Sequence, residues 1–228
     1  MTHSPEAHRP WFFDCDGVLL DSNRIKTEAF HVVASRYGED VANDVVQHHV
    51  EHGGISRFVK LRRIFDDVLQ RAPNPGELEQ LLSDFAALVG RGLFDAPVDS
   101  NAKELLSTLK ARGDRLFVVS GGATGEVQAA LRQHGLANHF ERIFGSPATK
   151  REHIDEIMSH LDLSGGWLVG DSREDMEVGR HFGLRRVLVT HWTEFDAWDR
   201  YVEEYPDITV VADLAELAEQ LPELTSEG

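Results

Sequence analysis

Five short apolar runs, each followed by a small or acidic residue, constrain the fold of this chain more than any other feature. They are continuously apolar rather than alternating, which is typical of strands buried on both faces of a sheet. A weaker run lies at residues 142–144. The five clear runs are Trp11–Phe13, Leu116–Val119, Trp167–Val169, Val187–Val189 and Ile208–Val211.

Helical patterns lie between these runs. Apolar residues recur at spacings of three and four over residues 102–109, 127–131 and 154–161, and Gly113 and Gly135 follow the first two as expected helix ends. Alternating strands and helices predict a parallel sheet that is covered on both faces. We therefore expect an α/β fold with a Rossmann-like, doubly wound core.

Residues 24–97 break this alternation because they contain helical patterns only, with a turn at residues 72–76. We interpret them as a small α-helical domain inserted after the first strand. The predicted division is a Rossmann-like core formed by residues 1–23 and 98–228, and a helical domain formed by residues 24–97.

Composition excludes several classes of protein. The formal net charge of −16 over 228 residues disfavours a nucleic-acid partner, because such a surface repels phosphates. No apolar run approaches the roughly 20 residues of a membrane span. The single cysteine, Cys15, excludes an internal disulfide, and the first ten residues lack the pattern of a secretion signal. We expect a cytoplasmic enzyme.

Four short segments carry polar groups at predicted strand ends or helix starts on one edge of the sheet. Ligands bind at this edge in open α/β sheets. Taken alone, each segment has an ordinary explanation as a turn, a helix cap or a solvated lysine. The segments are Asp14-Cys-Asp16-Gly17, Ser120-Gly121-Gly122, Lys150 and Gly170-Asp171-Ser172-Arg-Glu-Asp175.

Together, and in this order, the four segments resemble the motifs of the haloacid dehalogenase superfamily over nearly the whole chain. The stretch from Asp14 to Ser22 (DCDGVLLDS) is the most specific part. The resemblance is to the phosphatase branch with a helical cap after the first motif, as in phosphoglycolate phosphatases and β-phosphoglucomutases. It implies that residues 24–97 are a mobile cap that closes over the substrate.

Chemistry suggests roles for the two aspartates of the first segment. A carboxylate can attack phosphorus to form an aspartyl phosphate, and Asp14 is placed for this at the strand end. Asp16 lies two residues on, on the same side of an extended backbone, and can protonate the leaving alcohol and then deprotonate water. We expect crowding by other carboxylates to move the pKa of Asp16 toward neutrality.

The remaining core residues predict a cation and a phosphate site. Asp14, Asp171 and Asp175 form an oxygen-rich set of the kind that Mg²⁺ prefers. The resemblance adds the backbone carbonyl of Asp16 as a ligand. Lys150, Ser120 and the N–H of Gly121 would hold the phosphoryl oxygens.

Three functions remain open. The resemblance disfavours a dehalogenase, because that branch lacks an acid at the position of Asp16. We expect a Mg²⁺-dependent phosphomonoesterase that hydrolyses a small phosphorylated metabolite, either a sugar phosphate or a sugar-acid phosphate. The alternatives are a sugar phosphomutase and a non-catalytic binding domain of the same fold. The sequence gives neither the substrate nor the oligomeric state.

One segment of the predicted cap could reach the substrate. Gly54 lies in a flexible loop, and Arg57 and Lys60 follow it on one face of a predicted helix, where they could bind an acidic group of the substrate. The alternative is that both are solvated charges. Three histidines precede them, but no further Cys or His lies at zinc-ligand spacing, so we expect surface or hinge positions for His48, His49 and His52. The predicted cap contacts with the substrate are Gly54, Arg57 and Lys60.

Overall fold

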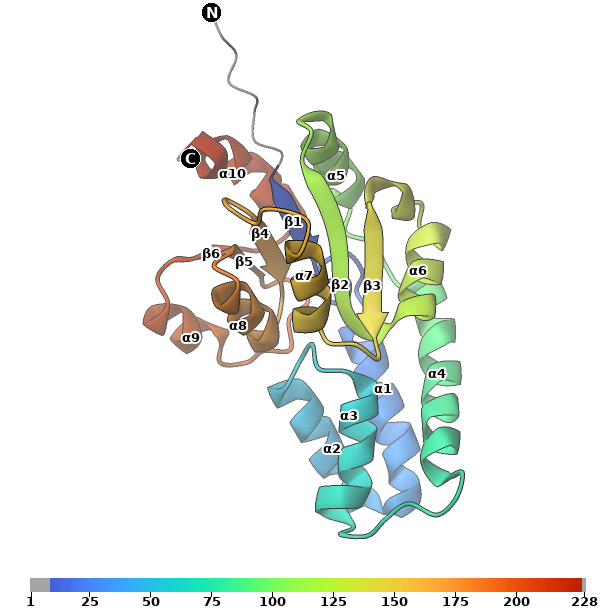
Figure 1. Cartoon of the computed structure of the whole chain (residues 1–228). Helices are drawn as coiled ribbons and strands as arrows, with labels where there is room; N and C mark the ends of the chain where they lie inside the picture. The colour runs from blue at the N-terminus through green and yellow to red at the C-terminus, as the bar shows by residue number, and fades with distance from the viewer. Residues whose placement is uncertain (1–8, 227–228) are drawn as a thin grey trace, which may run out of the picture.

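The computed structural model describes residues 9–226, and a six-stranded parallel sheet forms its centre (Figure 1). The strands lie in the order β3-β2-β1-β4-β5-β6, and every neighbouring pair is parallel. This confirms the α/β fold, and the weak run at 142–144 belongs to a strand. The strands are β1 (Pro10–Phe13), β2 (Arg115–Ala123), β3 (Arg142–Ser146), β4 (Trp167–Gly170), β5 (Arg185–Val189) and β6 (Ile208–Val211).

Helices cover both faces of the sheet. Side chains of β1 alternate between the faces, as expected for a strand, so that Trp11 and Phe13 join one buried cluster and Phe12 joins the other. The first cluster includes α5 (Ala102–Ala111), α6 (Thr124–Gln133) and α10 (Leu214–Ser226). The second includes α7 (Lys150–Met158), α8 (Arg173–His181) and α9 (Trp198–Glu204).

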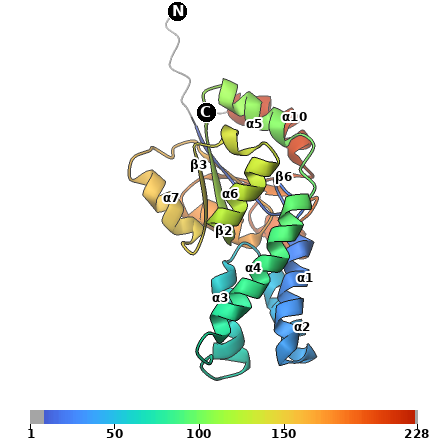
Figure 2. The same cartoon turned by 90° about the vertical axis from the view of Figure 1, so that its right-hand side faces the viewer.

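The four remaining helices lie together beyond the carboxyl ends of the strands (Figures 1 and 2). We call them the helical insertion. A 3₁₀ turn (Ser35–Tyr37) and a π-helical turn (Ile64–Val68) complete it. The exact division of the chain at residues 23 and 97 stays a prediction. The four helices are α1 (Asn23–Ala34), α2 (Glu39–Glu51), α3 (Arg57–Arg63) and α4 (Glu77–Asp95).

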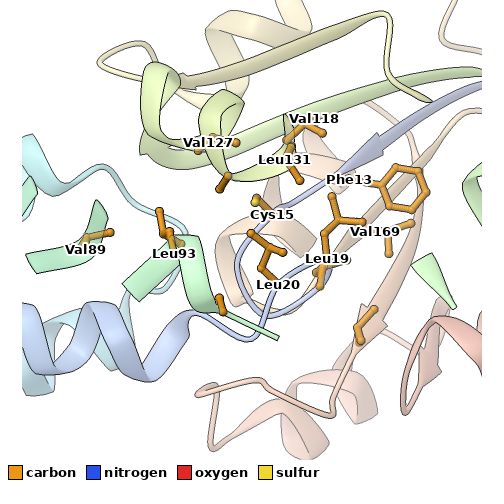
Figure 3. Packing of buried hydrophobic residues seen from close by; sticks show 14 of the residues in the cluster. Phe13, Cys15, Leu19, Leu20, Val89, Leu93, Val118, Val127, Leu131 and Val169 are labelled. Atoms are coloured by element: carbon orange, nitrogen blue, oxygen red, sulfur yellow. The ribbon is translucent and has the colours of Figure 1, made fainter. Parts of the chain in front are cut away.

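The helical insertion packs onto the core through apolar side chains. Figure 3 shows Val89 and Leu93 of α4 on one side and Cys15 and Leu20, from the loop after β1, on the other. All four side chains are at most 3% exposed and belong to one continuous cluster. Burial of this apolar surface stabilises the position of the insertion over the edge of the sheet.

Two expectations from the sequence concern the location of the protein. No helix within residues 9–226 is both long and apolar enough to cross a membrane. The absence of a secretion signal was inferred from the first ten residues, and residues 1–8 of that stretch lie outside the described part of the chain.

Candidate active site

The strand order places two of the predicted aspartates side by side. The order reverses between β1 and β4, which is the switch point where doubly wound sheets bind their ligands. Asp14 directly follows β1, and Asp171 directly follows β4. The backbone N–H of Asp14 donates to the carbonyl of Val169 at 2.9 Å, so the pairing of the strands continues up to Asp14.

Asp14, Asp171 and Asp175 converge at this point. One carboxylate oxygen of each lies within 4.8 Å of the others, and all three residues are buried. Burial raises the pKa of Asp14 to about 7, although Lys150 opposes the shift. Burial and the neighbouring charges of Asp14 and Asp175 raise the pKa of Asp171 well above its ordinary value. Three crowded oxygen donors with this mutual repulsion fit a hard divalent cation such as Mg²⁺.

Gly17 allows the loop after Asp14 to pass close to this cluster. Its φ of +73° lies in the left-handed region, and a Cβ atom there would stand 2.1 Å from Oδ2 of Asp171. Its N–H donates to the carbonyl of Leu20 at 2.8 Å, which closes a tight turn. A side chain at this position would collide with the carboxylate of Asp171.

Lys150 joins the cluster from the first turn of α7. Its Nζ lies 2.8 Å from Oδ2 of Asp14 and 2.5 Å from Oδ1 of Asp175. Burial alone would lower the pKa of Lys150, but the charges of Asp14 and Asp175 outweigh it and raise the pKa above its ordinary value. Ser172 also donates to Asp175, at 2.5 Å. The lysine therefore carries a fixed positive charge beside the predicted nucleophile.

Asp16 lies next to the cluster in an environment that the sequence did not predict. Its Oδ1 accepts a hydrogen bond of 2.6 Å from Ser22, while Oδ2 forms an ion pair with Lys26 and accepts a bond of 3.2 Å from Ser120. Burial favours a higher pKa, but the charge and hydrogen bonds of Lys26, with the bond from Ser22, lower the pKa of Asp16 below its ordinary value. The expected shift toward neutrality is therefore wrong for this arrangement.

Sequence analysis missed Lys26, although the chain contains a signal for it. Lys26 shares the buried face of α1 with Ala29, Phe30 and Val33. A lysine within an apolar stripe is a rare placement unless its charge is paired. Lys26 lies three residues after the start of α1, which begins beside the first motif. This position could have indicated that a carboxylate of the motif pairs with it.

Ser120 and Gly121 lie inside β2 rather than after it, which corrects their predicted position. The pairing of β2 with β3 is irregular between Val119 and Ala123, so the strand bends there. A Cβ atom on Gly121 would lie 2.4 Å from the carbonyl oxygen of Gly54. Backbone from the insertion therefore rests directly on this segment, as the prediction for Gly54 requires.

A single cleft joins the sheet edge to the helical insertion, and the three predicted cap residues all line it. A Cβ atom on Gly54 would be 3.4 Å from Nζ of Lys150. Arg57 forms two parallel hydrogen bonds with Glu126 of α6, one of them 2.8 Å from Nη1 to Oε1, so its charge is already matched. Lys60 is 2% exposed. The residues of the cleft used below are Asp14, Asp16, Lys26, His49, Gly54, Arg57, Lys60 and Glu194.

The predicted surface or hinge position is wrong for His49. This residue is 8% exposed and lines the cleft, and its ring lies 4.5 Å from the ring of Phe30, measured between centroids. Nδ1 of His49 lies 2.7 Å from Nζ of Lys60. The apolar spacing of α2 alone did not distinguish it from His48 and His52.

Comparison with known proteins agrees with this geometry. The sequence profile of the haloacid dehalogenase-like hydrolases matches residues 11–189. The chain belongs to this family. The haloacid dehalogenase-like profile spans all four motif segments and the helical insertion, so the resemblance drawn from the motifs is confirmed, as is the prediction of a hydrolase.

Three individual proteins are similar to this chain over most of their length. A phosphoglycolate phosphatase of Vibrio parahaemolyticus is 25% identical over 191 residues, which cover 78% of this chain and 82% of that protein. A predicted phosphatase of Clostridium acetobutylicum has a TM-score of 0.75 at 19% identity, over 95% of this chain and 99% of the other. A β-phosphoglucomutase of Clostridium difficile has a TM-score of 0.77 at 16% identity, over 96% and 97%. The two solved structures support the fold.

Proposed function

We propose that this protein is a Mg²⁺-dependent phosphomonoesterase that hydrolyses a small phosphorylated metabolite through an aspartyl phosphate on Asp14. The observation that carries the proposal is the convergence of Asp14, Asp171 and Asp175 within 4.8 Å, with Lys150 beside Asp14. The phosphoglycolate phosphatase among its relatives supports the same reaction class. The substrate would be a sugar phosphate or a sugar-acid phosphate, and the lone cysteine favours a cytoplasmic setting.

In the first step, Asp14 attacks phosphorus and the bond from phosphorus to the ester oxygen breaks. The leaving oxygen takes a proton from Asp16, whose carboxylate must first gain that proton. In the second step, water gives a proton to Asp16 and attacks phosphorus, which releases inorganic phosphate and regenerates Asp14. Both steps use the same acid and base, so no other proton carrier is required.

Other residues of the chain orient and stabilise the phosphoryl group. Lys150, the hydroxyl of Ser120 and the N–H of Gly121 would contact its oxygens and offset their charge. Asp14, Asp171, Asp175 and the carbonyl of Asp16 would hold Mg²⁺. The ion would supply charge stabilisation for the transferring oxygens, which are negatively charged like the carboxylates around them.

Release of inorganic phosphate from p-nitrophenyl phosphate tests this function. We expect turnover that depends on Mg²⁺ and is lost with EDTA. Asp14→Asn should lower kcat by at least about 1,000-fold, because it removes the nucleophile and leaves only binding and orientation. A phosphomutase would instead release little phosphate without a bisphosphate activator.

A matched variant separates chemistry from folding in this test. Asp155→Asn removes an exposed carboxylate on α7 that does not line the cleft, and it should keep full activity. If Asp14→Asn retains the activity of the parent protein while still binding Mg²⁺, then Asp14 is not the nucleophile and the proposal fails.

A further inference from the structure

Within residues 9–226, one buried cation of the cleft, Lys60, is not matched by a carboxylate. Lys150 pairs with Asp14 and Asp175, Lys26 pairs with Asp16, and Arg57 pairs with Glu126. Within residues 9–226, Lys60 has no carboxylate in ion-pair distance. Its hydrogen bonds go to Nδ1 of His49, at 2.7 Å, and to the carbonyl oxygen of His49, at 3.3 Å.

His49 adds an unused hydrogen-bonding atom to the same place. An ammonium group only donates, so Nδ1 of His49 accepts from Lys60, and the ring proton then lies on Nε2. Nε2 is buried and has no hydrogen-bond partner within the described residues. A buried polar atom without a partner costs free energy, and such an atom in a cleft is explained when a ligand supplies the missing partner.

The surroundings of Lys60 and His49 are largely apolar. Nζ of Lys60 lies 5.7 Å from the centre of the Phe30 ring, and Phe85 also lines the cleft. Burial, aided by the charge of Lys26, lowers the pKa of Lys60 to about 7. Glu194 is the acidic residue with the largest effect on Lys60, but it accepts hydrogen bonds of 2.8 and 3.0 Å from Thr27 rather than pairing with the lysine.

A purely structural explanation leaves this arrangement costly. Burying an ammonium group without a carboxylate requires desolvation that neither a neutral histidine nor a carbonyl offsets fully. In and beside the same cleft, the buried cations Lys26, Arg57 and Lys150 are each paired with a carboxylate, so partners of that kind are compatible with the fold. Because Lys60 alone among these buried cations lacks a carboxylate, its position indicates a site for an anion that a bound ligand supplies.

We propose that Lys60 and His49 form a subsite for a second anionic group of the substrate, either a carboxylate or a second phosphate. This proposal rests on the proposed phosphatase function. The ammonium group of Lys60 and the Nε2–H of His49 would donate to the anion, while the phosphoryl group lies at Lys150. Arg57 is excluded from this subsite because Glu126 already holds its guanidinium.

Gly54 shows how the two anion sites share one cleft. Its backbone lies against Gly121 on the sheet side, and Lys60 follows six residues later on α3 of the insertion. The second anionic group therefore belongs to the leaving part of the substrate, which faces the insertion while phosphorus faces Asp14. A substrate with a neutral leaving part would leave Lys60 without an anionic partner and Nε2 of His49 without a hydrogen-bond partner.

Matched pairs of phosphate esters test the subsite. Each pair differs at the second group: 3-phosphoglycerate and glycerol 3-phosphate, 6-phosphogluconate and sorbitol 6-phosphate, and glucose 1,6-bisphosphate and glucose 6-phosphate. The first two pairs test a carboxylate, and the third tests a second phosphate. We expect kcat/KM for the doubly anionic member to exceed that of its partner by about 10- to 100-fold in at least one pair, the effect of charge-assisted hydrogen bonds.

Variants assign this preference to its residues. Lys60→Met keeps the stem and removes the charge, and His49→Phe keeps the ring and removes both nitrogens. Each should bring the ratio within the preferred pair down toward 1, and a general loss of activity cancels because the ratio is taken within one variant. Lys103→Met removes an exposed lysine of α5 outside the cleft and should keep the parent ratio.

The outcomes separate this proposal from the function it depends on. If p-nitrophenyl phosphate is hydrolysed but no pair shows a preference, or if Lys60→Met retains the preference, the subsite is wrong and the phosphatase stands. If the parent protein hydrolyses no ester, the phosphatase proposal fails. Calorimetry with the same pairs on Asp14→Asn then tests the subsite by binding, and equal affinity within all pairs would overturn it.

Discussion

The two sides of the cleft have opposite charge imbalances. On the side of the sheet, three buried carboxylates face a single lysine, Lys150. On the side of the helical insertion, Lys60 is buried with a neutral histidine and no carboxylate partner within residues 9–226. The first side carries an excess of buried negative charge, and the second carries a buried positive charge that no carboxylate pairs with.

This contrast separates chemistry from selection. The sheet side can hold a cation and a phosphoryl group whatever the leaving group is. On our proposal, the insertion side would contact the part of the substrate that leaves. A divalent ion together with a substrate that carries one phosphoryl group and a second anionic group would offset the charges of both sides. The two imbalances are therefore explained by the same bound ligands.

The largest expected effect concerns the acid on the sheet side. Asp16→Asn should lower kcat/KM for an alkyl phosphate such as glycerol 3-phosphate by about 100- to 10,000-fold, because the alkoxide then leaves without a proton. The loss should be smaller for p-nitrophenyl phosphate, whose leaving group is stable as an anion. Equal losses for both esters, measured as kcat/KM, would mean that Asp16 does not protonate the leaving group.

A smaller effect is expected where the insertion reaches the sheet side, at Lys26. The ion pair with Lys26 favours the ionised form of Asp16 and lowers its pKa. Lys26→Met should therefore raise the pKa of Asp16, and the alkaline limb of the profile of kcat/KM against pH should move to higher pH. We expect kcat/KM near neutral pH to rise by about 10-fold, because more of Asp16 is then protonated. This factor corresponds to the loss of one charged hydrogen bond.

The test of Lys26 is whether the alkaline limb of the pH profile moves to higher pH. A parent-like pH profile in Lys26→Met would show that the ion pair does not control the protonation of Asp16. Lys110→Met removes an exposed lysine of α5 and serves as the control, which should keep the parent profile.

The sheet side was predictable from the sequence because strand ends fix positions. Parallel strands that end together bring Asp14 and Asp171 to one edge, and the switch in strand order makes them neighbours. The same alternation places the start of α7 at Lys150 and puts Asp175 in the first turn of α8. Residue type and order along the chain were therefore enough to assemble this half of the cleft.

The insertion side was less predictable because its contacts join helices whose packing the sequence does not specify. A helical pattern placed Arg57 and Lys60 on one face, yet it could not show that Glu126 of α6 would hold Arg57. His49 and Lys26 lie on helix faces that are otherwise apolar. From the sequence, a polar residue there only weakens the helical pattern and does not indicate a site. Only the packing of α1, α2 and α3 against each other shows that both side chains enter the cleft.

Metal binding should stabilise the protein more at pH 7 than at pH 5. Without the ion, the folded state raises the pKa of Asp14 to about 7 and that of Asp171 in the same direction. Between the unfolded value of 3.8 and about 7, the folded state then binds more protons than the unfolded state, so the free energy of unfolding falls as pH rises. Mg²⁺ stabilises the ionised form of these buried carboxylates, so its benefit grows over the same interval.

The measurement is the difference in Tm between Mg²⁺ and EDTA at each pH. We expect about 5–10 °C at pH 7 with saturating Mg²⁺, and much less at pH 5, where protons compete for the carboxylates. Taking this difference cancels the pH-dependent contributions to Tm of groups that the ion does not contact, such as His49. In Asp171→Asn the difference should be small at both pH values. A difference in the parent protein that does not change with pH would contradict the raised pKa values of Asp14 and Asp171.

The smallest effect concerns the ion pair that joins the two sides, Arg57 with Glu126. Arg57→Met and Glu126→Gln should each lower the free energy of unfolding by about 1–3 kcal/mol, and the double variant should lose less than the sum because the two changes remove one interaction. Denaturant unfolding of the three variants gives the coupling. The preference for doubly anionic esters should survive in Arg57→Met, because Lys60 and His49 are intact. Loss of that preference together with additive stabilities would assign the anion to Arg57, and the imbalance on the insertion side would then belong to a different residue.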